Sequence, residues 1–266
     1  MARENLYKEE DMSLEKYLSK DVIATRPGKV IYREDDTVVK IFDKSYSKSD
    51  ILNEALNQAS AEESGLPIPK LLEVLNYDGL WGLRTEFIEG STLSEMMEKH
   101  PENQDEYLDR FLKIQINMFN HKAPNRLNDL KAKFHNRISR SGFDATNRFE
   151  LHNRLEGLPT HNKICHGDFV PSNIILHPDG TDYIIDWAHV TSGNASADVA
   201  LTYLLFQLDD KVELAEEYLK RYCKMTDTAI QYVQKWMPIV AAVQSERNIE
   251  GQQEFLRRWG NIMEFE

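Results

Sequence analysis

The sequence contains little cysteine and no long apolar run. Its 266 residues include only two cysteines, Cys165 and Cys223, and no Cys-x-x-Cys pair. This usage favours a reducing compartment and argues against a structural zinc site. No stretch of about 18 apolar residues occurs, so we expect no membrane-spanning helix. The N-terminus is charged and lacks the apolar segment of a secretory signal, and we therefore expect a cytoplasmic protein.

Basic residues are outnumbered by acidic ones. The 32 lysines and arginines stand against 44 aspartates and glutamates, which gives a formal charge of −12. Such a charge repels nucleic acids and anionic membranes, so we expect neither as a partner. It would tolerate or attract a cationic small molecule. An ordinary acidic surface is the simpler explanation when charge is considered alone.

The apolar pattern divides the chain into a β-rich part and a helical part. From Val22 onward it predicts three strands, a helix and two more strands, with a hairpin turn at 34–36 and another at Asp78-Gly79. The runs behind this prediction are 30–32, 38–42, 50–63 (the helix), 71–77 and 81–88. We therefore expect an N-terminal lobe at residues 1–88, in which the polar residues 1–20 form a peripheral helix or a frayed end.

The remaining residues, 89–266, are expected to form a mainly helical C-terminal lobe. Thr92 or Ser91 can cap a first short helix, with Glu95 in its first turn. Further helices are predicted near 105–120, 127–141 and 146–155, and from about 197 to the end, with a β interlude at 164–186. A hinge near 86–90 would join the two lobes, and the cleft between them is the expected ligand site.

The motif that carries the chemistry is HGDFVPSN at 166–173, followed by IIDW at 184–187. Asp168 and Asn173 lie five residues apart on one loop, and Asp186 ends the next short hairpin. These side chains can bring three oxygen ligands together, and Mg²⁺ prefers oxygen ligands. One carboxylate would remain to accept or orient the proton of an attacking hydroxyl. This combination is typical of phosphoryl transfer in kinases.

The motif resembles the aminoglycoside phosphotransferase and choline kinase superfamily. Protein kinases carry H-R-D-L-x-x-x-N and then D-F-G, whereas Gly167 and Asp186-Trp187-Ala188 occupy those places here. The resemblance implies an α+β, bilobal, protein-kinase-like fold, in which the N-terminal lobe binds nucleotide and the C-terminal lobe binds the acceptor and carries the catalytic loop. It also implies ATP and Mg²⁺ as cofactors and assigns a role to each motif residue. Asp168 would be the catalytic base, Asn173 and Asp186 would hold the metal, and His166 and Asp198 would brace the loop.

Elements upstream of the motif fit the same resemblance. Lys40 lies in a strand similar to the kinase V-A-I-K strand, where it would contact the α- and β-phosphates, and Glu54 on the next helix would pair with it. Backbone groups of Glu86 and Ile88 would bind the adenine edge. The phosphate-covering loop departs from the protein-kinase pattern because it offers only Gly28 in place of G-x-G-x-x-G. Gly28-Lys29 is not a Walker P-loop either.

The acceptor is left open by the sequence. A hydroxylated small molecule is expected, such as an aminoglycoside, a sugar or an amino alcohol. Carboxylates near the C-terminus would suit an amino sugar, and nearby aromatic rings would suit a quaternary amine. Solvated helix faces and core packing are the simpler explanation for these residues, which are Glu246, Glu250, Glu254, Glu264, Glu266, Tyr232, Trp236 and Trp259.

Three functions are compatible with the motifs. The first is an active small-molecule kinase. The second is a catalytically weak nucleotide-binding relative that acts as an interaction module, although Lys40, Asp168, Asn173 and Asp186 are all present. The third is a protein kinase, which is disfavoured because Gly167 replaces the usual arginine and no A-P-E segment follows Asp186. The oligomeric state is not indicated by the sequence.

Overall fold

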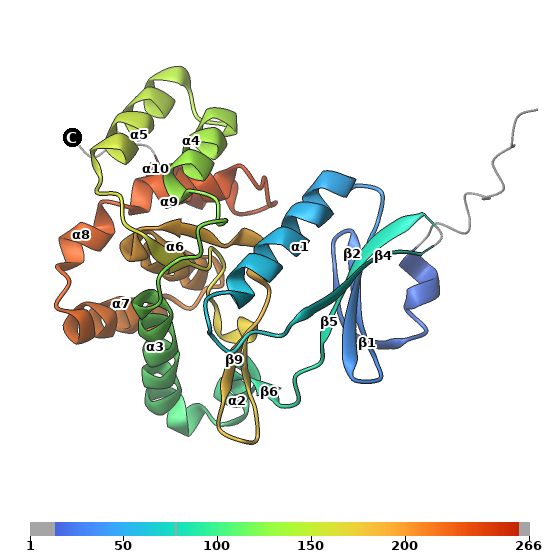
Figure 1. The fold of residues 1–266 in the computed structure, drawn as a ribbon. Helices are drawn as coiled ribbons and strands as arrows, with labels where there is room; N and C mark the ends of the chain where they lie inside the picture. The colour runs from blue at the N-terminus through green and yellow to red at the C-terminus, as the bar shows by residue number, and fades with distance from the viewer. Residues whose placement is uncertain (1–13, 78, 261–266) are drawn as a thin grey trace, which may run out of the picture.

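Two lobes of different composition make up the chain, as expected from the sequence (Figure 1). The computed structural model describes residues 14–77 and 79–260. Strands dominate the first lobe and helices the second, so the α+β bilobal architecture is confirmed. Most of the predicted peripheral segment, and the acidic Glu264 and Glu266, lie outside the described residues. No helix in the described ranges combines the length and the apolar character needed to cross a lipid bilayer.

A five-stranded antiparallel sheet forms the N-terminal lobe, in the order β1-β2-β3-β5-β4. Its strands are β1 (Asp21–Arg26), β2 (Lys29–Glu34), β3 (Thr37–Phe42), β4 (Leu71–Tyr77) and β5 (Leu80–Glu86). In the register, Lys40 of β3 lies between Ile31 of β2 and Leu83 of β5. Strands β2 and β5, on either side of β3, thus fix the position of Lys40 in the sheet. The last predicted strand was too long, because residues 87–90 form an irregular connection to the second lobe.

Helix α1 (Lys48–Glu62) links the two lobes. It begins two residues before the predicted start because Ser47 and Asp50 form a reciprocal capping box with each other's backbone N–H groups. It packs on β4 and β5 and also on a 3-10 helix of the second lobe, Trp187–His189. Asn57 of α1 donates a hydrogen bond to the Ala188 carbonyl at 2.8 Å. One helix therefore couples the sheet to the segment that follows Asp186.

The C-terminal lobe is built around helix α6 (Ala195–Leu208), which is apolar and buried on nearly every side. Helices α7, α8 and α9 pack against it. The helices of this lobe are α2 (Leu93–Lys99), α3 (Gln104–Asn120), α4 (Leu130–Arg140), α5 (Ala145–Gly157), α6, α7 (Val212–Thr226), α8 (Ile230–Gln234), α9 (Met237–Ser245) and α10 (Gln253–Gly260). The short strands are β6 (Ser91–Thr92), β7 (Lys163–Cys165), β8 (Ile174–Leu176), β9 (Asp182–Ile184) and β10 (Thr191–Gly193).

Side-chain caps set the helix boundaries in this lobe. Thr92 and Glu95 form the predicted capping box of α2. Asp129 caps α4 and Asp144 caps α5, so these helices differ from the predicted ranges by one to three residues at each end. The helical region predicted from residue 197 begins two residues earlier, because Asn194 caps α6, and it is divided into five separate helices.

Candidate active site

The loop that carries the HGDFVPSN motif, at 166–173, follows β7 and is tied to the central helix of the lobe. Asp198, in the first turn of α6, accepts hydrogen bonds from the backbone N–H groups of Gly167 at 2.7 Å and of His166 at 3.2 Å. Asp198 is buried, and burial raises the pKa of its carboxyl. These bonds fix the backbone immediately before Asp168, which is the geometry that a bracing role for Asp198 requires.

His166 connects the loop to the segment that carries Asp186. Its Nδ1 accepts from the backbone N–H of Asp168 at 3.2 Å, so its Nε2 carries the proton and donates to the Ile185 carbonyl at 3.0 Å. The imidazole is fully buried, and its ring centre lies 4.8 Å from that of Trp187. His166 is therefore placed to hold two chain segments together and is not exposed to a ligand.

Gly167 stands where protein kinases have arginine, and the structure gives a reason. Its φ of +78° lies in the left-handed region, and a Cβ there would come within 2.7 Å of the His189 carbonyl oxygen. A side chain at this position would collide with backbone, which cannot easily move. The departure from H-R-D at this position is therefore a packing requirement of this chain.

Asn173 and Asp186 supply the oxygen atoms expected of a metal site. The Asn173 side-chain amide donates to the Asp168 carbonyl at 2.9 Å, which leaves its side-chain oxygen available. Asp186 follows the β8–β9 hairpin and has a left-handed φ of 62°, and the Ile185 N–H donates to the Asn173 carbonyl at 2.9 Å. The neutral amide oxygen of Asn173 and the carboxylate of Asp186, on adjoining segments, fit Mg²⁺. This ion is commonly held by one or two protein groups together with phosphate and water.

Lys40 brings the two lobes together electrostatically. Its Nζ lies 2.7 Å from Glu54 Oε1 on α1 and 3.1 Å from Asp186 Oδ1, with the lysine side chain 15% exposed. Burial alone would lower the pKa of Lys40, but the Asp186 and Glu54 carboxylates outweigh it and raise that pKa. Lys40 in turn is the main cause of the depressed pKa of Asp186. The predicted Lys40–Glu54 contact is thus present, and it extends to Asp186.

The turn between β1 and β2 requires the single glycine of this region. Gly28 has a φ of +72°, and a Cβ there would lie 2.9 Å from Ser45 Oγ. Its carbonyl accepts from the Asp43 N–H at 2.8 Å, which folds the turn back onto the end of β3. The turn is therefore tight, and its backbone faces the segment after Lys40.

Lys29 is a second cation in the cleft that the sequence reasoning missed. Its Nζ lies 5.9 Å from the ring centre of Phe42, its partner across β2 and β3. Burial and the neighbouring Lys40 ammonium lower the pKa of Lys29, and the carboxylates of Asp186, Glu54 and Asp168 raise it. The register could have revealed Lys29, because two-residue alternation from the predicted hairpin puts it on the same sheet face as Lys40.

Some backbone N–H groups of the hinge residues already form hydrogen bonds within the protein. The Glu86 N–H donates to the Lys70 carbonyl at 3.0 Å, and the Phe87 N–H donates to the Asp36 carbonyl at 3.0 Å. The Glu86 donor is therefore unavailable to adenine. Its carbonyl and the backbone of Ile88 are the groups on which adenine binding at this hinge would depend.

Residues named as possible acceptor contacts are largely engaged elsewhere. Glu246 is paired with Arg137 and Arg140, at 3.0 and 3.1 Å. Trp236 is fully buried in the core, and Trp259 packs against the core. The Tyr232 hydroxyl accepts from Asn194, and Glu254 pairs with Arg258. Core packing and helix-surface ion pairs account for these side chains.

A family model described as the phosphotransferase enzyme family, APH, matches residues 28–234. The chain belongs to this family. The match spans all the site residues described above, from the Gly28 turn to Asp198. No curated protein sequence matches the chain significantly.

Solved structures of this family share the fold. An apo aminoglycoside phosphotransferase APH(4)-Ia has 13% sequence identity and a TM-score of 0.62, covering 94% of this chain and 98% of its own. The choline kinase LicA of Streptococcus pneumoniae has 19% identity and a TM-score of 0.57, covering 91% and 90%. An aminoglycoside-3′-phosphotransferase of type VIII has 17% identity and a TM-score of 0.59, covering 81% and 88%. The protein-kinase-like fold expected from the motif is confirmed. Another APH(4)-Ia structure is a ternary complex with AMP-PNP and hygromycin B.

Proposed function

We propose that this phosphotransferase transfers the γ-phosphate of ATP to a hydroxyl group of a small molecule. The observation that carries the proposal is the contact of Lys40 with both Glu54 and Asp186, which joins the two lobes at the expected nucleotide site. Desolvating this partly buried contact is costly, and the contact fixes Lys40 beside Asp186, as kinase catalysis requires. Nucleotide complexes of structural neighbours support the same conclusion.

The residues take the following roles in the proposal. Asp168 accepts or orients the proton of the attacking hydroxyl, while Lys40, held by Glu54, contacts the nucleotide phosphates. Asn173 and Asp186 would hold Mg²⁺, which neutralises phosphate charge when it is bound. Lys29 would supply a second cation to the phosphates, next to the Gly28 turn. The backbone of Glu86 and Ile88 would form the adenine hinge, and His166 and Asp198 would brace the loop.

The acceptor class rests on the neighbours and on the loop. Structural neighbours include a complex with hygromycin B and a choline kinase. Both names point to small acceptors. The Asp168 side chain is half-buried on a loop that the core holds in place. A small hydroxylated molecule could reach such a side chain between the lobes.

Acceptor-dependent ADP release with Mg²⁺ tests the proposal. The acceptors would be aminoglycosides, choline-like amines, sugars and sugar acids, and the variant would be Asp168→Asn. We expect a fall in kcat of roughly 100-fold or more, with little change in ATP affinity, because the base contributes mainly in the transition state. Asp209→Asn, an exposed aspartate at the end of α6, is the matched control and should retain full activity.

Two outcomes would contradict the proposal. Absence of acceptor-dependent ADP release with every class would reject the enzymatic function and favour an interaction module. Turnover that is equal in the wild type and in Asp168→Asn would reject the role of Asp168 while leaving the reaction class intact.

A further inference from the structure

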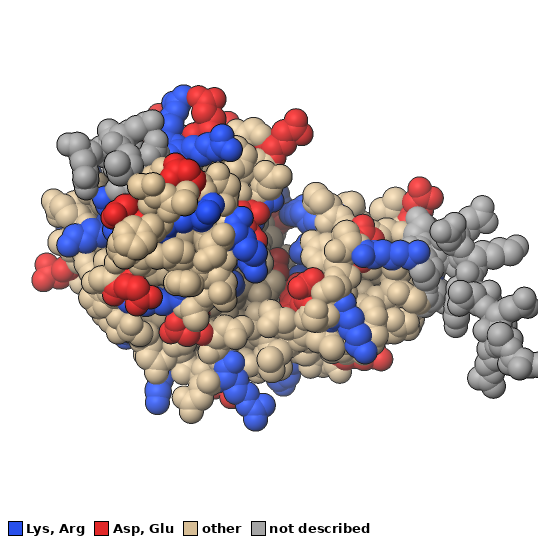
Figure 2. Space-filling model, turned by 90° about the horizontal axis from the view of Figure 1, so that it is seen from above, with Lys and Arg blue, Asp and Glu red and all other residues tan. Residues whose placement is uncertain are grey.

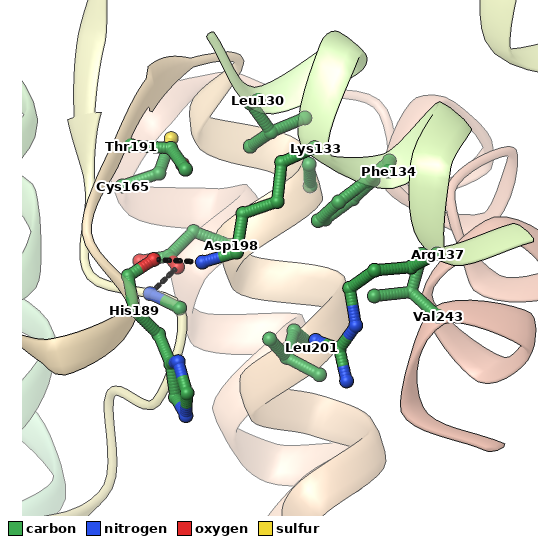
Figure 3. Close-up of a pocket in the computed structure, with 12 residues that line it drawn as sticks. Leu130, Lys133, Phe134, Arg137, Cys165, His189, Thr191, Asp198, Leu201 and Val243 are labelled. Carbon is green, nitrogen blue, oxygen red and sulfur yellow. Dashed lines mark hydrogen bonds between the residues drawn. The ribbon is translucent and has the colours of Figure 1, made fainter. Parts of the chain in front are cut away.

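A cluster of basic side chains lies directly behind the catalytic loop. Lys133, Arg137 and Arg140 of α4 are spaced so that they share one side of the helix, and Arg247 follows the end of α9, which packs against α4. Figure 3 shows Lys133 and Arg137 descending from α4 toward α6, with the Lys133 ammonium directed at His189. We call these four residues the basic cluster.

The basic cluster is connected to Asp168 through a short chain of contacts. Lys133 Nζ donates a hydrogen bond to the His189 carbonyl at 2.8 Å. That same carbonyl faces Gly167 so closely that a Cβ on the glycine would be 2.7 Å away. Gly167 immediately precedes Asp168. The basic cluster thus begins one residue from the proposed base, on the side of the loop that faces α4.

Positive charge in the cluster exceeds the negative charge that pairs with it. Glu246 is its one salt-bridge partner among the described residues, and it serves both Arg137 and Arg140. The nearby Asp198 carboxylate is already occupied by two backbone N–H groups. Within the described ranges, the Arg247 guanidinium forms no hydrogen bond or ion pair. A protein with a formal charge of −12 therefore places four cations at this site against one salt-bridged carboxylate.

The cluster is also partly desolvated. Lys133, Arg137 and Arg247 are all half-buried. Burial, followed by the charges of Arg137 and Arg247, lowers the pKa of Lys133 to about 7. Burial and Arg247 likewise lower the pKa of Arg137. Crowded, half-buried like charges are unfavourable in the free protein, and an anion placed among them would relieve their repulsion.

We propose that the basic cluster binds an anionic group of the acceptor, so that the phosphorylated small molecule carries a carboxylate or a phosphate besides its hydroxyl. This inference rests on the proposed phosphotransferase function and names its substrate class. The cavity enclosed by Lys133, Arg137, His189 and Asp198 has a volume of about 10 Å³, room for roughly one water. The anion therefore binds outside this cavity, next to the partly exposed Arg247, while Arg137 is only 13% exposed and paired with Glu246.

The surface fits an approach from the cleft. Figure 2 shows Lys and Arg side chains, with Asp and Glu side chains among them, beside the hollow between the lobes. An anionic acceptor approaching there would be attracted by the basic cluster, and its hydroxyl would be directed to Asp168. A polycationic acceptor would be repelled by the same cluster. The charge preference is thus opposite to the one that the overall acidic composition suggests.

The test compares acceptors that share one ring and differ in charge. Glucose, glucosamine, glucuronate and glucose 6-phosphate are assayed for ADP release with the wild type, Arg247→Gln, Arg247→Glu and the control Arg257→Gln. Arg257 lies on the exposed side of α10 and undergoes the same loss of charge. Binding of inorganic phosphate to the protein saturated with Mg-ADP is measured in parallel by calorimetry, which does not depend on turnover. Comparing glucuronate with glucose 6-phosphate separates a carboxylate from a phosphate group.

We expect the anionic sugars to exceed glucose, and glucosamine to be the poorest acceptor. Arg247→Gln should weaken phosphate binding and raise the KM for the anionic acceptor by roughly tenfold, because a charge-assisted hydrogen bond is lost. Arg247→Glu should shift the preference toward glucosamine, and Arg257→Gln should resemble the wild type.

Preference for glucosamine or glucose in the wild type would overturn the inference and leave the phosphotransferase function standing. Equal phosphate binding by the wild type and Arg247→Gln would also overturn it. Phosphate binding that depends on Arg247, without turnover of any acceptor, would uphold the anion site and count against the proposed enzymatic function.

Discussion

Replacement of Lys40 with methionine tests the charge arrangement on which the site depends. Methionine fills similar space but removes the ammonium that lies 2.7 Å from Glu54 and 3.1 Å from Asp186. At an effective dielectric constant of about 20, each pair has a gross Coulomb attraction of roughly 5–6 kcal/mol. Desolvation cancels much of this attraction, and removing one partner from a buried pair costs about 3–5 kcal/mol. Because the Asp186 side chain is 33% exposed, we expect the lower end, about 3 kcal/mol.

Urea denaturation of the nucleotide-free protein at pH 7 provides the measurement. With a slope of about 2–3 kcal/mol/M, the midpoint for Lys40→Met should fall by roughly 1 M. Lys44→Met is the matched control, since Lys44 is exposed in the connection after β3, and its midpoint should not move. Calorimetry should also show weaker ATP binding by Lys40→Met.

The pH dependence of the same difference gives a second readout. Lys40 holds the folded-state pKa of Asp186 below its ordinary value of 3.8. The resulting stability is fully present above that value and is lost as the pH falls through the folded-state pKa. The difference in free energy of unfolding between the wild type and Lys40→Met should therefore be constant from about pH 5 to 7 and should narrow toward pH 2. The ion-pair argument is refuted if Lys40→Met has the same urea midpoint as the wild type at pH 7. It is also refuted if the difference between their free energies of unfolding does not change with pH.

Three further variants probe the turn, the second cation and the buried lysine. Gly28→Ala should lower the free energy of unfolding by about 1–2 kcal/mol in thermal denaturation, because of its left-handed φ and the contact with Ser45; an unchanged melting temperature would show that the turn can relax. Lys29→Met should weaken ATP binding roughly tenfold in calorimetry, because the proposed second phosphate cation is lost. Stability should not fall, because the partly buried ammonium is removed with the side chain. Unaltered ATP affinity would exclude Lys29 from the nucleotide site. In Lys133→Met the loss of the bond to His189 is independent of pH, but the charged lysine is disfavoured in the folded state below its pKa of about 7. Melting temperatures should therefore favour this variant more at pH 6 than at pH 9.5, and equal differences at the two pH values would contradict the lowered pKa.

Sequence reasoning succeeded where a local pattern has a local cause. The α1 and α2 helices were predicted from apolar periodicity and capping residues, and their ends moved only where a cap such as Ser47 was not recognised. The β-rich and helical halves followed from strand and helix periodicity. The last N-terminal strand was extended two residues too far, because Phe87 and Ile88 continue its apolar pattern into the expected hinge at 86–90.

Asp168 and its companions were singled out from their spacing, and their proposed roles came from the family resemblance. The five-residue separation of Asp168 and Asn173 fixes their relation within one loop, and the structure ties their segments together with a bond of 2.9 Å. Gly167 illustrates the limit of the same reasoning. The sequence shows that it replaces an arginine, but the reason lies in the His189 carbonyl, which approaches from a separate segment.

The sequence by itself determined the two-lobed architecture, the position of the HGDFVPSN motif and the identity of the charged residues around it. Tertiary structure alone decided which charges meet. Lys40 and Asp186 are 146 residues apart, and only packing of α1 between the lobes brings both to one point. The basic cluster likewise draws on α4 and on the end of α9, which no periodicity relates. Electrostatic interactions depend on distance and burial in space, and the sequence specifies these only through the completed fold.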